Sequence, residues 1–130
     1  MIQANIYFKD SRAIGFEVAG HANSGPYGYD LVCAAVSAIT FGTVNAVMTL
    51  CDVHPDVNQG EDGYLYVKIP HSATDSQKDK ASFLFEGMLV SLQTVEQEYS
   101  DFITIEKKII IGGAVKCYVW ICNFSLRKKE

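Results

Sequence analysis

The sequence predicts a single α+β domain, in which a small, mostly antiparallel sheet carries two helices in the order β-β-α-β-β-α-β. Three observations support this fold class. Several short segments alternate apolar and polar residues, as half-buried strands do. Two longer segments have helical patterns, and no repeat, linker or low-complexity run divides the chain of 130 residues, which is a usual length for one domain.

Two alternating segments at the N-terminus predict a β-hairpin with one buried face and a turn at residues 9–12. Its buried positions are Ile2, Ala4, Ile6 and Phe8 in the first strand, and Ile14, Phe16 and Val18 in the second.

A segment rich in glycine, residues 20–29, follows the hairpin and predicts a loop. Asp30 is the expected N-cap of a helix over residues 31–51, because its carboxylate can accept hydrogen bonds from the amides of the first turn. This helix has hardly any polar stripe, so we expect it to be buried on most sides at the centre of the core.

The second half of the chain predicts another pair of strands, a helix and a last strand. Residues 52–69 contain the two strands, with a turn from Gly60 to Gly63. Asp75 or Ser76 can cap the following helix, which has one apolar face, and the last strand covers residues 102–105. We expect the domain to span residues 1–106. Residues 107–130 then form an atypical extension of unknown role, either an extra hairpin or a cover for an apolar surface at a dimer interface.

Composition excludes several classes of protein. A net charge of −4 argues against general binding to the phosphate backbone, so we expect no direct binding of nucleic acid. The four cysteines lack the spacing of a zinc site, which indicates a reduced, cytoplasmic protein without a metal. No basic segment of a signal peptide opens the chain, and the apolar stretch at 109–124 is too short to span a membrane. We expect no cofactor and no membrane contact.

Cys33 and His21 are the candidates for chemistry. Cys33 falls in the first turn of the predicted helix, where free amides and the helix dipole favour an anion such as a thiolate. His21 ends the second strand, and the loop could bring its imidazole to the start of the helix. The two would form the thiolate-imidazole dyad that nucleophilic catalysis by cysteine requires. We expect the loop to be open without substrate and to close over a bound peptide, with Asn23, Ser24, Gly25 and Gly28 as its gating residues.

The same residues also have purely structural explanations. A cysteine in an alanine-rich helix is commonly a small buried apolar residue. Ser37, one turn after Cys33, could face the same site or bond a carbonyl of the preceding turn. Asp30 is explained by capping alone, and orienting His21 would be an additional role.

The string GHA at residues 20–22 is followed by a glycine-containing loop and by the string GYDLVCAAVSA at residues 28–38. In these motifs the chain resembles the ribosomal-processing cysteine protease family (Prp). The opening hairpin, the strand GYLYV at residues 63–67 and the helix around residues 85–93 are similar as well. The resemblance covers about residues 1–106 and leaves out the C-terminal extension.

This resemblance implies a dimeric, cytosolic endopeptidase that removes a short N-terminal extension from a large-subunit ribosomal protein. It implies that His21 is the general base and Cys33 the nucleophile, with Asp30 and Ser37 in supporting positions. Gly20, beside the base, would let the substrate backbone approach closely. Amides at the helix N-terminus would be the donors to the oxyanion.

The residues alone leave two other functions open. One is a non-catalytic module that binds a ribosomal protein during ribosome assembly. The other is thiol chemistry different from proteolysis, such as acyl transfer through Cys33.

Overall fold

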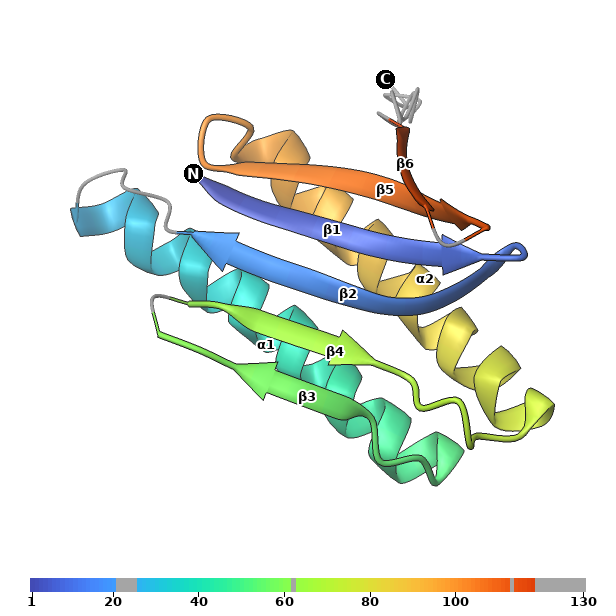
Figure 1. Cartoon of the computed structure of the whole chain (residues 1–130). Coiled ribbons are helices and arrows are strands. Elements are labelled where there is room, and N and C mark those ends of the chain that lie inside the picture. The colour runs from blue at the N-terminus through green and yellow to red at the C-terminus, as the bar shows by residue number, and fades with distance from the viewer. Residues whose placement is uncertain (21–25, 62, 113, 119–130) are drawn as a thin grey trace, which may run out of the picture.

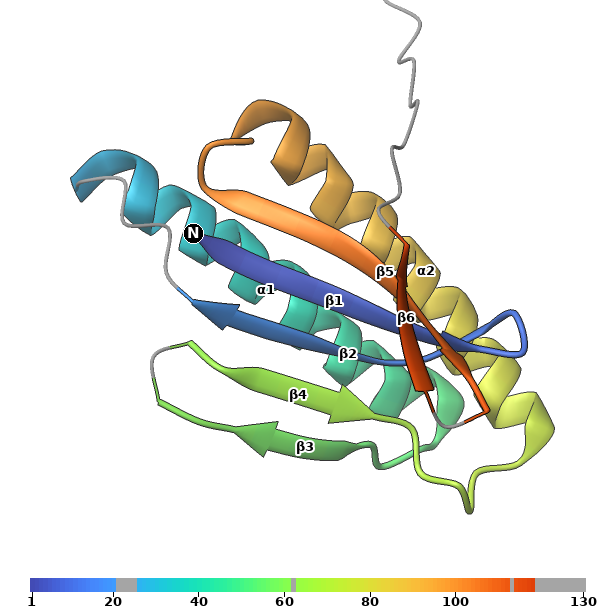
Figure 2. The same ribbon diagram turned by 45° about the horizontal axis from the view of Figure 1, so that its top comes forward.

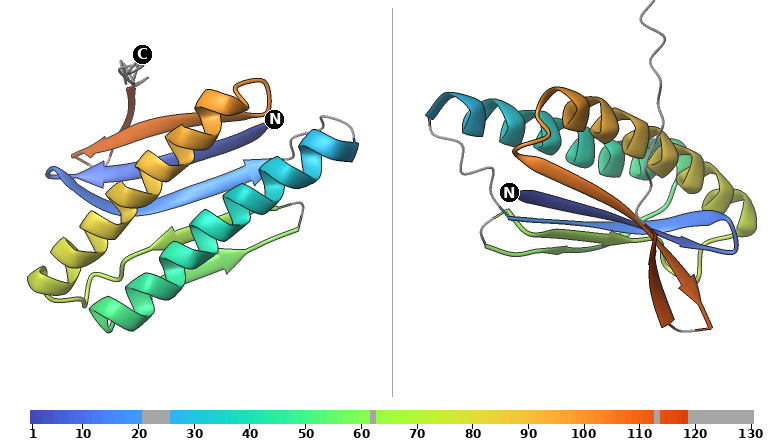
Figure 3. Two further views of the ribbon diagram at one scale, coloured as in Figure 1. Left: turned by 180° about the vertical axis from the view of Figure 1, so that it is seen from behind. Right: turned by 90° about the horizontal axis from the view of Figure 1, so that it is seen from above.

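The computed structural model describes residues 1–20, 26–61, 63–112 and 114–118. It is a two-layer arrangement in which both helices cover the same face of one sheet (Figure 1; Figure 3, right). The sheet has six strands in the order β3-β4-β2-β1-β5-β6. The elements are β1 (Ile2–Lys9), β2 (Arg12–Gly20), α1 (Pro26–Cys51), β3 (Asp56–Gln59), β4 (Leu65–Lys68), α2 (Asp75–Glu98), β5 (Ile103–Ile111) and β6 (Ala114–Tyr118). The predicted fold class and element order are confirmed through β5.

The sheet is mostly antiparallel, as predicted, and β1 lies inside it. β1 pairs with β2 through a tight turn in which Asp10 and Ser11 have φ values of 52° and 64°, as hairpin turns of the primed types require. On its other side β1 pairs with β5 in parallel, with Ile2 beside Ile103. This parallel pair is the one exception among the strand pairs of the described residues.

The last predicted strand is longer than expected. β5 continues past residue 105 to Ile111 and pairs with β6 in a hairpin around Gly112. The extra hairpin was one of the two forms expected for this region. The β5–β6 hairpin turns away from the helix layer (Figure 2; Figure 3, right).

The core lies between the sheet and the two helices, where the alternating residues of the first hairpin face inward. Phe16 of β2 and Phe85 of α2 are fully buried, and their rings meet edge to face at 5.5 Å between centroids. Val32 and Val47 of α1 are also fully buried. Burial of such side chains contributes about 1.5–3 kcal/mol each and fixes the helices on the sheet.

The expectation that the first long helix is buried on most sides is wrong. α1 lies on the sheet and beside α2 (Figure 3, left), and its far side is open: Leu31 is 56% and Leu50 67% exposed. The segment Leu31–Cys51 is long and apolar enough to cross a membrane by length and composition, with a mean hydropathy of 1.9. A core helix of a soluble protein passes the same test, and α1 packs one of its sides on the sheet.

The start of α2 is one residue earlier than expected. Its N-cap is Thr74, whose side chain accepts a hydrogen bond from the Gln77 amide at 3.2 Å, while the Gln77 side chain accepts one from the Thr74 amide at 2.9 Å. This is a capping box, which satisfies two amides at once and therefore takes precedence over Asp75 or Ser76 alone.

Candidate active site

Cys33 lies in a cavity of about 310 Å³ between α1, the end of β2 and the tip of the β3–β4 hairpin. The thiol belongs to a half-buried residue that packs against the edge of the core. One turn later, Ser37 lines the same cavity, and Gly20 lines it from the end of β2. The structure therefore brings together three of the predicted site residues.

The start of α1 corrects the predicted setting of Cys33. The helix begins at Pro26, so Gly28 and Asp30 lie inside it, and Asp30 is not its N-cap. Proline is favoured at the first helical position because its missing amide would be unpaired there anyway, and the proline of this segment had been assigned to a loop. Cys33 follows Pro26 by seven residues, about two turns of helix. The effect of the helix terminus, which fades within the first turn, does not reach the thiol.

Cys51 is the contrasting thiol. It is only 5% exposed, and burial raises the pKa of its thiol, an effect that Lys80 partly opposes. Cys51 also lines a cavity, of about 400 Å³, but a buried thiol that keeps its proton is unreactive, whereas Cys33 is only half-buried. Cys51 belongs to the hydrophobic core.

Two hydroxyl groups of α1 face the cavity in different states. The buried Thr40 donates to the carbonyl of Val36 at 2.8 Å, which occupies its only hydrogen. Ser37 is exposed, and within the described part of the chain its hydroxyl makes no hydrogen bond. Ser37 is therefore available to bind a group that enters the cavity.

Two glycines lie where the end of β2 meets the tip of the β3–β4 hairpin in the cavity wall. Gly20 has a φ of 90°, and a side chain there would overlap the carbonyl oxygen of Met1. Gly63 has a φ of 75°, and a Cβ added to it would lie 3.2 Å from the carbonyl oxygen of Gly20. The hairpin tip thus approaches the end of β2 closely because Gly63 lacks a side chain, while the missing side chain of Gly20 leaves room for the N-terminus at Met1.

A carboxylate holds the hairpin tip from the open face of the sheet. The Tyr64 hydroxyl donates to Glu17 at 2.9 Å, and the buried Asn5 amide donates to the other oxygen of Glu17 at 3.3 Å. The hydrogen bond to Glu17 is the main cause that raises the pKa of Tyr64 above its usual value. Tyr64 lines the Cys33 cavity, so this network fixes one of its walls.

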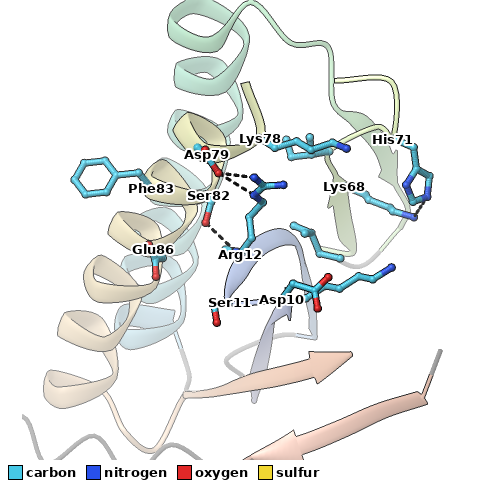
Figure 4. Close-up of a pocket in the computed structure, with 14 residues that line it drawn as sticks. Asp10, Ser11, Arg12, Lys68, His71, Lys78, Asp79, Ser82, Phe83 and Glu86 are labelled. Carbon is cyan, nitrogen blue, oxygen red and sulfur yellow. Dashed lines mark hydrogen bonds and ion pairs between the residues drawn. The ribbon is translucent and has the colours of Figure 1, made fainter. Parts of the chain in front are cut away.

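A second cavity, of about 570 Å³, lies at the other end of the sheet between the β1–β2 turn, the end of β4 and the start of α2 (Figure 4). The Arg12 guanidinium bonds Asp79 at 2.6 and 2.9 Å, and the Nζ of Lys68 lies 3.5 Å from Nε2 of His71. The lining of this larger cavity contains no cysteine. The cavity of about 310 Å³, which the half-buried Cys33 lines, is therefore the candidate active site.

His21 and the gating residues Asn23, Ser24 and Gly25 lie outside the described residues, as does the side chain of Asp30. Among the described residues, no group of three or more His, Cys, Asp or Glu side chains could hold a metal ion.

The hairpin tip is the part of the site that the sequence did not reveal. Gln59 and Gly60 line the Cys33 cavity together with Gly63 and Tyr64. These residues read only as a turn, because their proximity to Cys33 depends on β4 pairing with β2. The pair of glycines was the one local signal.

The chain is similar to known proteins over most of its length. The family model described as cysteine protease Prp matches residues 1–104. The ribosomal processing cysteine protease Prp of Bacillus subtilis is 46% identical over 112 residues, which are 85% of this chain and 100% of that protein. The protein of the same name from Staphylococcus aureus is 41% identical over 68% of this chain and 81% of its own length.

Solved structures agree with the fold. A crystal structure of the Prp protease from S. aureus with a covalently linked product peptide has a TM-score of 0.72 at 37% identity, covering 83% of this chain and 100% of that one. A structure of the S. aureus protease with a substrate peptide has a TM-score of 0.70 at 36% identity and the same coverage. A Streptococcus mutans protein has a TM-score of 0.75 at 32% identity, covering 85% of this chain and 96% of its own.

Proposed function

Because this chain belongs to the Prp family of cysteine proteases, and is therefore a cysteine protease, we propose that Cys33 is its nucleophile and His21 its general base. The observation that carries the proposal is the position of Cys33, a half-buried thiol at an open cavity, whereas Cys51 is buried. Gly20 lines this cavity, and His21 is the next residue in the sequence. The covalently linked product peptide of the similar S. aureus protease supports a covalent route.

The reaction proceeds through an acyl-enzyme. His21 takes the proton from Cys33 Sγ, and the thiolate attacks the scissile carbonyl carbon. When the tetrahedral intermediate collapses, the C–N bond breaks, and the protonated His21 delivers its proton to the leaving amine. Water then hydrolyses the thioester and restores the thiol.

The oxyanion needs donors other than the helix terminus. At Cys33, two turns inside α1, the backbone amides bond carbonyls four residues earlier and are not available. The cavity offers the Ser37 hydroxyl, and Gln59, whose side chain ends in an amide, is another of its lining residues. Either can donate to a developing negative charge.

The substrate in this proposal is a large-subunit ribosomal protein with a cleavable N-terminal extension. Support comes from the relatives, which are named ribosomal processing proteases, and from the S. aureus structure with a substrate peptide. We propose that the extension is removed before that protein assembles into the ribosome. Because the reaction then precedes ribosome assembly, we also place it in the cytoplasm.

Cleavage of peptides tests the proposal. Peptides that tile the N-termini of large-subunit ribosomal proteins are incubated with the wild type and with Cys33→Ala, His21→Ala and Cys51→Ala, and the products are read by mass spectrometry. We expect one internal cut by the wild type and by Cys51→Ala, and none by the other two variants. Binding of a peptide by all four proteins without any cut would contradict the proposal and favour the non-catalytic binding module.

We further propose that the chain is a homodimer that associates through the outer side of the helix pair. Phe83 of α2 is 77% exposed, and beside it a groove of about 620 Å³ runs between the helices. An added Cβ at Gly42 of α1 or at Gly87 of α2 would have nothing within 4 Å, so the groove is open at both glycines. A protruding aromatic ring next to an open groove suits a two-fold contact, in which each copy inserts its ring into the groove of the other.

Light scattering during gel filtration tests the dimer. Phe83→Glu should convert the chain to a monomer, because it places a charge in an apolar contact. Ile111→Glu is the matched control, since Ile111 is also exposed, at 51%, but lies on β5. A wild type that is monomeric, or a Phe83→Glu variant that remains a dimer, would contradict this interface.

A further inference from the structure

We propose that the substrate binds as an added strand along the outer edge of β3, in an extended conformation that leads its scissile bond into the Cys33 cavity. This inference rests on the proposed protease function and adds how the substrate is recognised. β3 is the outermost strand on one side of the sheet (Figure 1), and all four of its residues are exposed.

The hydrogen bonds of the hairpin tip show which peptide groups of β3 face outward. The Gly60 amide donates to the Tyr64 carbonyl at 3.0 Å, so these two residues form a hydrogen-bonded pair. Bonded and non-bonded pairs alternate along antiparallel strands. Asn58 therefore bonds toward β4, and the peptide groups of Val57 and Gln59 point away from it.

The other side of β4 gives the same alternation independently. The Ile69 amide donates to the Ile14 carbonyl at 2.9 Å, in line with the pairing of β4 and β2. By alternation, Val67 and Leu65 bond toward β2, which leaves Tyr66 to bond toward β3. Tyr66 is the partner of Asn58, so both sides of β4 agree.

Within the described chain, the outward-pointing amides and carbonyls of β3 form a strand edge that pairs with no other strand. Val57 and Gln59 make no hydrogen bond to another described residue on that side. Each presents one amide donor and one carbonyl acceptor, spaced about 7 Å apart along the strand. Such an edge is the template for addition of an extended peptide.

The edge is continuous with the candidate active site. Gln59 lines the Cys33 cavity, and so does Gly60, the next residue. The side chain of Val57 lies on the same face as that of Gln59, because the two are two residues apart in a strand. A peptide paired with both residues therefore reaches the mouth of the cavity, and Val57, 48% exposed, offers an apolar contact to one of its side chains.

The first test uses the wild-type protein and backbone-modified substrates. The best-cleaved peptide of the ribosomal series is resynthesised with a single N-methyl group at each amide in turn. An added strand bonds with every second residue, so we expect kcat/KM to fall about fivefold or more at alternate amides on one side of the cut and to change little between them. A scan without this alternation would overturn the inference.

The second test changes the outer edge of β3 in the protein itself. Val57→Pro removes one outward amide while keeping an apolar side chain, and Val57→Thr keeps the amide. Proline is tolerated where the amide of an edge strand points outward, and circular dichroism verifies that both variants fold. We expect about a fivefold loss of kcat/KM for Val57→Pro relative to Val57→Thr on the long peptide. On a peptide truncated to the residues at the cut, the two variants should be equal.

The outcomes separate this inference from the proposed function. If the wild type cuts none of the peptides, the proposed protease reaction fails. If the wild type cuts them, but N-methylation shows no alternation and both Val57 variants act alike on the long peptide, only the added strand is wrong. Alternate losses together with a deficit of Val57→Pro on the long peptide alone support it.

Discussion

Replacement of Gly20 by alanine should destabilise the protein by an amount that follows from its backbone. At a φ of 90° an L-residue pays roughly 1–2 kcal/mol that glycine does not. The new Cβ would also overlap the Met1 carbonyl, so the start of β1 must shift, which strains the bond of 2.8 Å from the Ile2 amide to the Phe102 carbonyl. Loss of that bond adds about 1 kcal/mol. We expect the free energy of unfolding to fall by about 2–3 kcal/mol in total.

Thermal and urea unfolding followed by circular dichroism measure this loss, at a protein concentration at which the chain is monomeric. For a domain of this length it corresponds to a fall in Tm of about 10 °C. Gly42→Ala is the control, since an added Cβ there has nothing within 4 Å and helix propensity predicts a gain of about 0.5–1 kcal/mol. A Gly20→Ala variant as stable as the wild type would refute the reasoning, because it would mean that alanine adopts this conformation without strain.

Three further predictions concern other described residues. Ser82→Ala leaves the Ala13 amide without its acceptor at 2.9 Å, so unfolding in urea should show a loss of about 1–3 kcal/mol, and an unchanged midpoint would count against it. Iodoacetamide should alkylate Cys33 much faster than Cys51 in the native protein at pH 8, because Cys51 is buried and the pKa of its thiol is raised. Peptide mapping measures the two alkylation rates, and equal rates would argue against this contrast between the thiols. Burial, with a neighbouring carboxylate, raises the pKa of Tyr7 to about 12. Since this folded-state pKa exceeds the unfolded value of about 10, the associated stability is complete below pH 10 and is lost as the pH rises toward 12, so Tyr7→Phe should show a shallower alkaline decline.

Local sequence patterns predicted which segments form strands and helices better than they predicted which sides of the helices are buried. The alternation of Ile2, Ala4 and Ile6 indicates a strand and its buried face, and the structure has both. The apolar run of α1 indicates a helix, but hydropathy does not distinguish a side that faces the sheet from a side that faces solvent. Leu31 and Leu50 look the same in the sequence as Val47, which is fully buried.

The sequence predicted only those parts of the site whose residues lie close together in the chain. Cys33 and Ser37 share one side of the cavity because they are one helical turn apart, and Gly20 stands at the end of a predicted strand. The wall formed by Gln59 and Tyr64 depends on which strands become neighbours, and a single sequence carries no direct signal for that order. The predicted setting of Cys33 is wrong for a different reason: a proline in a glycine-rich segment predicts a loop, although proline also begins helices, as Pro26 does here.

The pairing of β1 with β5 has a consequence for the synthesis of the protein. The first strand forms half of its sheet contacts only when residues 103–109 are present, about a hundred positions later in the chain. Contacts between such distant segments slow folding, because a long loop must close before they form. Ile2 lines the Cys33 cavity, and besides Gly20 of the neighbouring hairpin strand it pairs with Ile103, so this edge of the cavity completes its strand pairing late. A nascent chain should therefore acquire a complete cavity only after β5 has left the ribosomal exit tunnel.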